Sequence, residues 1–78
     1  MSLIDEYQVI RKLSLNNHIF NQNIGKFVRL VIVGGHKFMA EPIEVRDDRY
    51  FFKLIGQGLN DHPLASHPVN QVIDIIPL

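Results

Sequence analysis

The side chains of this sequence that can do chemistry are few, and their spacing builds no catalytic or metal-binding set. His62 and His67 lie five residues apart beside two prolines, and no cysteine or paired carboxylate completes a ligand set around them. Gly34-Gly35 is followed by neither Lys-Ser/Thr nor a helix start, so it does not form a phosphate-binding loop. Asp47-Asp48 occupies a turn and lacks the buried partner of a catalytic carboxylate. We therefore expect no catalytic residue, no metal, no cofactor and no enzymatic activity.

Arg49 and His67 are polar side chains suited to binding a ligand without transforming it. An Arg guanidinium pairs with phosphate groups and stacks on nucleic-acid bases. A histidine such as His67 can hydrogen-bond a base edge or a backbone group. Exposed arginines and loop histidines without any such role are equally ordinary, so the residue types alone leave both interpretations open.

A helix is expected over residues 2–13. Ser2 and Asp5 have the spacing of a capping box, and Leu3, Tyr7 and Ile10 fall on one helical stripe, with Leu13 as a further candidate. Four asparagines then follow between residues 16 and 23, which is unfavourable for a helix. We therefore expect residues 14–25 to form a loop or a fraying extension of the helix.

Strand signals extend from about residue 26 to residue 77. The β-branched and apolar segments cover 27–33, 37–46, 49–55 and 72–76, with a short fifth candidate at 64–67. Gly34-Gly35 is a tight-turn signal between the first two segments, and Asp47-Asp48 is a turn before the third. The whole chain, residues 1–78, therefore reads as one small domain.

The second strand segment changes face partway along its length. Phe38 and Ala40 share one parity, whereas Ile43 and Val45 share the other. Because a strand needs an extra residue to change faces, we expect a bulge at Glu41-Pro42. A bulge bends a strand, as a small barrel requires.

Composition favours self-association. The chain has 78 residues, of which 46% are hydrophobic and 21% charged, and a domain of this size is marginally stable on its own. Several strands are apolar on both faces, while one small sheet needs only one face for its core. We expect a homo-oligomer, with a subunit interface at the last strand through Val72, Ile73, Ile75 and Ile76.

The sequence indicates a cytoplasmic protein. Residues 1–6 lack the basic region and apolar core of a signal peptide, and the longest uncharged apolar run, 30–33, is too short to span a bilayer. The absence of cysteine is compatible with a reducing compartment. The formal net charge of zero argues against strong non-specific nucleic-acid binding, but not against a local basic patch.

In residues 31–38, VIVGGHKF, an apolar strand runs into a residue pair ending in Gly, followed by a Lys and a large apolar residue. This segment resembles the first hairpin of the Sm-like family, most of all of its bacterial Hfq branch. Residues 43–50 resemble the second strand and the turn into the third. Residues 72–77, VIDIIP, resemble the closing strand, which also ends in two apolar residues and Pro. The similarity spans roughly residues 27 to 77, together with the helix by its position.

The resemblance implies a fold and a function. The fold is mainly β, with an N-terminal helix followed by a five-stranded, strongly bent Sm-like or SH3-like small barrel. The function is a homo-oligomeric ring that binds single-stranded RNA near its pore. The family places an aromatic residue at this turn to stack on a base, which is Tyr50 here, while Asp48 braces the turn and His67 lies near the RNA-binding histidine. A ring also repeats Arg49 once per subunit, so a neutral chain can present a basic ring.

Departures from the family pattern keep other hypotheses open. Phe52 stands where many Sm proteins have Asn, and Ser66 stands where Hfq has Lys. With the zero net charge and the asparagine-rich segment 16–23, these favour a ring that serves as a structural or protein-interaction module without nucleic acid. A core position for Tyr50 is the alternative to base stacking, and a monomeric SH3-like barrel is a third possibility.

Overall fold

A computed structural model describes the backbone of residues 3–56 and 62–78, and the side chains of residues 12–56 and 62–78. Helix α1 (Leu3–Gln22) comes first, and the strands follow: β1 (Val28–Ile32), β2 (Lys37–Arg46), β3 (Arg49–Ile55), β4 (Leu64–Pro68) and β5 (Val72–Pro77). A short 3₁₀ helix, η1 (Val69–Gln71), connects β4 to β5.

The five strands form one antiparallel sheet in the order β4-β3-β2-β1-β5. This confirms the expected N-terminal helix, five strands and mainly β character. No pairing between β4 and β5 is present in the described residues, so these two strands are the edges of an open sheet. The expected Gly34-Gly35 turn joins β1 to β2, with φ angles of 98° and 86° that an L side chain rarely adopts.

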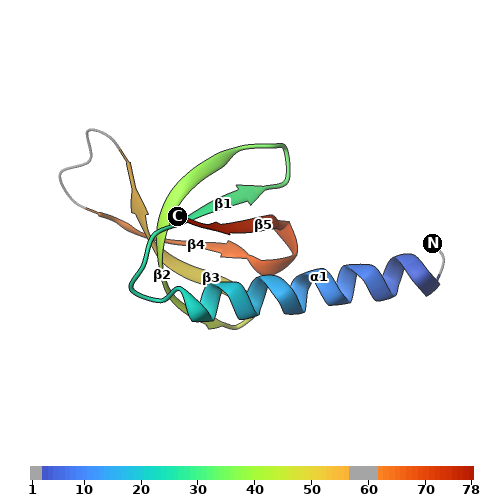
Figure 1. Ribbon diagram of the computed structural model, residues 1–78. Coiled ribbons are helices and arrows are strands. Elements are labelled where there is room, and N and C mark those ends of the chain that lie inside the picture. Colours follow the sequence, from blue (N-terminus) through green and yellow to red (C-terminus); the bar gives the residue numbers. More distant parts are fainter. Residues whose placement is uncertain (1–2, 57–61) are drawn as a thin grey trace.

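The expected bulge lies in β2, one residue beyond the predicted position. The pairing of β2 with β3 shifts register between Pro42 and Glu44, so Ile43 is the extra residue. Figure 1 shows β2 as a long, curved strand that pairs with β1 along its first half and with β3 along most of its length. The bulge supplies this bend because it disrupts the ladder on one strand only.

The core lies between one face of the sheet and the C-terminal half of α1, which contacts β2 and β5. Its buried residues are Phe20, Val28, Leu30, Ala40, Tyr50, Phe52, Val72 and Ile75. Figure 1 shows the N-terminal half of α1 extending beyond the sheet, and the longest extent of the molecule is 46 Å.

The predicted end of the helix was wrong, because α1 continues from residue 13 to Gln22 through most of the expected loop. Asparagine is a poor helix former, but its intrinsic cost is well under about 1 kcal/mol per residue and tertiary contacts outweigh it. Asn16 is fully buried, Asn17 accepts a hydrogen bond from β3, and Phe20 is buried in the core. The helix ends where Asn23 Nδ2 donates to the Ile19 carbonyl, at 2.7 Å.

The expected capping box begins at Ser2, which lies outside the described residues, as do the side chains of the predicted stripe Leu3, Tyr7 and Ile10. Within the described part of the chain, no helix is long and apolar enough to cross a membrane.

We predict that the Phe20→Ala variant loses about 3–5 kcal/mol of unfolding free energy, because it leaves a cavity where the helix meets the sheet. Leu15→Ala is the matched control, since Leu15 lies on the same helix and is 50% exposed. This control is expected to change stability by less than about 0.5 kcal/mol. Urea denaturation followed by circular dichroism measures both, and equal losses would contradict the packing described here.

Candidate functional site

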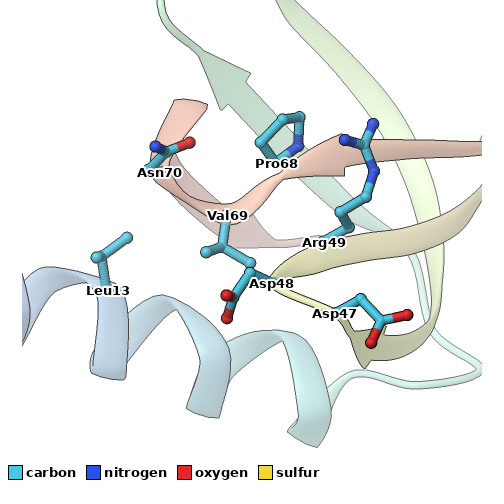
Figure 2. A pocket seen from close by; sticks show the side chains of 7 residues that line it. All are labelled: Leu13, Asp47, Asp48, Arg49, Pro68, Val69 and Asn70. Atoms are coloured by element: carbon cyan, nitrogen blue, oxygen red, sulfur yellow. The ribbon is translucent and has the colours of Figure 1, made fainter.

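A cavity of about 510 Å³ lies where the β2–β3 turn meets the connection from β4 to β5. Its lining residues are Leu13, Asp47, Asp48, Arg49, Pro68, Val69 and Asn70. Figure 2 shows Leu13 projecting from α1 toward the η1 segment, with Asp48 between the helix and Val69. Three separate parts of the chain therefore converge on one hollow.

The β2–β3 turn has an unusual backbone conformation. Asp47 and Asp48 have φ angles of 53° and 57°, and they connect the paired residues Arg46 and Arg49. Two successive positive φ angles in a two-residue hairpin are typical of a type I′ turn, which prefers Asn-Gly or Asp-Gly. The expected turn is confirmed, and its second position holds an aspartate where glycine fits better.

A backbone hydrogen bond joins the β2–β3 turn to the connection between β4 and β5. The Val69 N–H donates to the Asp48 carbonyl at 3.0 Å. This bond fixes the start of η1 against the β2–β3 turn, so the residues that line the cavity hold a defined relative position.

Arg49 is anchored at one end and open at the other. Its Nε donates to Ser66 Oγ on β4 at 3.1 Å, and the side chain forms no ion pair with any described residue. Figure 2 shows the guanidinium pointing away from α1, beside Pro68. The remaining guanidinium N–H groups are therefore free to donate to a ligand. The cavity is thus lined by Asp47, Asp48 and Arg49 together with apolar residues, and the Arg49 guanidinium lies on the side of the site that faces away from α1.

Tyr50 lies in the core rather than at the cavity. Its side chain is 0% exposed, its ring packs on Phe20 with a centroid distance of 4.6 Å, and its hydroxyl donates to Asn17 Oδ1 at 2.6 Å. Burial raises the pKa of Tyr50 from 10.0 to about 12. The structure therefore gives Tyr50 the core position, with no exposed ring face for a base.

His67 also faces the interior of the fold. It lies directly opposite Tyr50 in the β3–β4 register, and antiparallel partners share one face of the sheet. Its ring contacts Phe38 edge-on, with centroids 6.5 Å apart. Of the four predicted RNA-binding residues, the structure brings Asp48 and Arg49 together at the cavity and places Tyr50 and His67 apart from it.

The predicted interface residues on β5 divide into two pairs. Val72 and Ile75 are buried in the core of their own chain, at 4% and 2% exposure. Ile73 and Ile76 are 47% and 40% exposed and are available to a second chain. Val72 and Ile75 are three residues apart and reach the same core-facing side because the bulge inserts Ile73 between them.

Sequence reasoning predicted two of the lining residues, Asp48 and Arg49, and missed the contributions of the others, which are Leu13, Asp47, Pro68, Val69 and Asn70. Asn70 follows Pro68 in a turn-like context, which was a usable signal, whereas Leu13 reaches the site only because α1 passes beside it. Among the described residues, no three His, Cys, Asp or Glu side chains are grouped so that they could hold a metal ion.

Comparison of the chain with known protein-family models, with curated proteins and with solved structures found no match.

We predict that Tyr50→Phe lowers the unfolding free energy by about 0.5–1.5 kcal/mol at pH 8, through loss of the hydrogen bond to Asn17. The difference between wild type and variant should shrink and then reverse in sign as pH rises from 10 to about 12. In that range the unfolded tyrosine releases its proton while the folded one retains it, so wild-type stability falls at up to about 1.4 kcal/mol per pH unit. Denaturant titrations of both proteins across this range measure the difference, and a constant gap would contradict the buried hydroxyl.

Proposed function

We propose that this chain is an Sm-like domain, bent into a small barrel, that assembles as a homo-oligomeric ring and binds single-stranded RNA through the cavity described above. The observation that carries the proposal is the convergence of Asp48 and Arg49 with the β4–β5 connection in one hollow. The helix followed by five antiparallel strands agrees with what the family resemblance implies.

The cavity has the chemistry for an unstacked base. RNA-binding proteins that read single strands hold splayed bases by hydrogen bonds to their edges and by packing against their faces. The carboxylates of Asp47 and Asp48 accept hydrogen bonds from amino groups, and the Arg49 guanidinium donates to carbonyl and phosphate oxygens. Leu13, Pro68 and Val69 provide apolar contact for a base face. Because Tyr50 is buried, this binding mode does not use it.

The open sheet supplies a route to a ring. Strands β4 and β5 are opposite edges of the same sheet, so β4 of one copy can extend the sheet of the next at β5. Such a head-to-tail contact is heterologous, and it generates a ring when the rotation between copies closes. Leu64 on β4 is 73% exposed, and Ile73 and Ile76 on β5 provide the matching apolar side chains.

We predict that native mass spectrometry detects a discrete oligomer of identical subunits larger than a dimer. A head-to-tail contact that closes gives one defined stoichiometry. A monomer at all accessible concentrations would contradict the ring and support the single SH3-like barrel instead.

Arg49→Gln is expected to weaken the binding of short U-rich or A-rich RNA at least about fivefold, equivalent to about 1 kcal/mol for one lost contact. Fluorescence anisotropy at low salt measures this, since phosphate contacts are strongest there. Arg29→Gln is the control, because Arg29 is an arginine on the same sheet that is exposed, whereas Arg49 is partly buried, and Arg29 does not line the cavity. If wild type binds neither RNA, the RNA-binding proposal is wrong.

Asp48→Gly separates a role in the turn from a role in binding. Glycine relieves the positive φ of this position, so we expect stability to rise by up to about 1 kcal/mol. Loss of the carboxylate is expected to weaken RNA binding in the same variant. A more stable protein with unchanged RNA affinity would show that Asp48 only shapes the turn.

A ring that acts as a protein-interaction module is the second candidate. It is favoured by the burial of Tyr50 and by the two carboxylates in the cavity, which give the site no excess of positive charge. A 260/280 absorbance ratio that stays low during purification, together with a ring mass and no RNA affinity, would support it over RNA binding.

A further inference from the structure

The outer edge of β5, which faces away from β1, is partly covered by side chains of the same chain. The Ile75 N–H donates to Asp74 Oδ1 at 3.1 Å, so this donor does not pair with β1. Alternation along an antiparallel ladder places the nitrogen of Pro77, two residues later, on the same outer side, and proline has no N–H to offer. The outer edge at these two positions therefore has no unpaired backbone donor.

Helix α1 adds further contacts to the N-terminal half of β5. Lys12 Nζ bonds the same Asp74 Oδ1 atom at 3.1 Å. Asn16 Nδ2 donates to the carbonyls of Val72 and Ile73, at 3.4 and 3.3 Å, where β5 carries a bulge opposite β1. Because a bulge leaves backbone groups outside the ladder, these carbonyls need partners from elsewhere.

The opposite edge of the sheet differs. Within the described residues, no side chain hydrogen-bonds the backbone of β4, and the nearest polar contact, Arg49 to Ser66, joins side chains only. Pro68 at the end of β4 also lacks an N–H, as Pro77 does on β5, so the difference between the edges lies in the side-chain hydrogen bonds, which only β5 receives among the described residues.

We propose that Asp74, held in place by Lys12, is a latch that sets how readily copies of this chain assemble. The inference rests on the proposed ring, in which β4 of a second copy pairs with β5. That strand needs the Ile75 N–H as a donor, so it displaces the Asp74 carboxylate and leaves Lys12 without its partner. Assembly then competes with two hydrogen bonds inside the subunit, from Ile75 N–H and from Lys12 to the Asp74 carboxylate. Any condition that weakens these bonds favours the ring. Raised ionic strength is one such condition, because both side chains are nearly half exposed and their attraction is screened.

The test compares assembly midpoints by sedimentation velocity over a concentration series of the full chain. Asp74→Ala removes both competing hydrogen bonds and is expected to lower the concentration of half-assembly by about fivefold or more, since one such bond alone is worth about that factor. Lys12→Met should give a smaller decrease, since Asp74 keeps its bond to Ile75. Asp74→Asn retains an acceptor and serves if the alanine variant is poorly folded, with an expected midpoint between those of Asp74→Ala and wild type.

Glu44→Ala is the matched control. Glu44 is a carboxylate of similar exposure, 47% against 44% for Asp74, and it pairs with Arg46 at 3.2 Å on a strand inside the sheet. It changes the net charge equally but touches neither edge, so its midpoint should equal that of wild type. Amide hydrogen exchange adds a direct readout: the Ile75 amide should exchange faster in monomeric Asp74→Ala than in monomeric wild type, and become protected on assembly.

The outcomes separate the latch from the ring. If wild type assembles and Asp74→Ala assembles at the same or higher concentration, the latch is wrong and the ring stands. If Glu44→Ala shifts the midpoint as much as Asp74→Ala, net charge rather than the latch explains the shift, and the latch is again wrong. If no variant assembles at any concentration, both the ring and the latch are wrong.

Discussion

The contact between the C-terminal half of α1 and the sheet is the interaction on which the rest of this structure depends. Phe20 fills the space above Tyr50, and Asn17 satisfies the tyrosine hydroxyl, so a large aromatic side chain is buried with its polar group paired. Without the helix, the apolar face of the five-stranded sheet would be exposed to water. The same contact orients α1 so that Leu13 reaches the cavity and Lys12 and Asn16 reach β5.

The candidate site forms because the β2–β3 turn and the connection between β4 and β5 are fixed against each other. The β2–β3 turn adopts positive φ angles at two aspartates, a conformation that costs free energy for residues other than glycine. The hydrogen bond from Val69 to Asp48 stabilises the turn against the β4–β5 connection. Strained turns of this kind are often retained at binding sites, and the aspartates give the cavity polar groups that the glycine of an optimal turn would not provide.

The two unpaired edge strands of the sheet connect the fold to the proposed assembly. A sheet with two free edges can be extended from either side, and natural proteins usually protect such edges with charges, prolines or bulges. Each edge strand carries a proline, Pro77 on β5 and Pro68 on β4, but among the described residues only β5 adds a side-chain cap, from Asp74, and a bulge at Ile73. This asymmetry is compatible with directional, head-to-tail association, in which one edge is offered freely and the other is exposed only when its own contacts are broken.

The sequence by itself determined the strand content of this protein. Alternating β-branched residues and two turn signals, Gly34-Gly35 and Asp47-Asp48, predicted the observed bounds of β2 and β3. The change of face within β2 predicted the bulge to within one residue. These signals are local, because a strand's faces and its turns depend on near neighbours. The sequence also singled out Asp48 and Arg49. Only the tertiary structure decided the length of α1, because Asn16 and Asn17 occupy core-facing positions that apolar periodicity does not recognise. It alone also decided that Tyr50 is buried and that Leu13 lines the cavity, since both depend on a helix packing against strands distant in sequence.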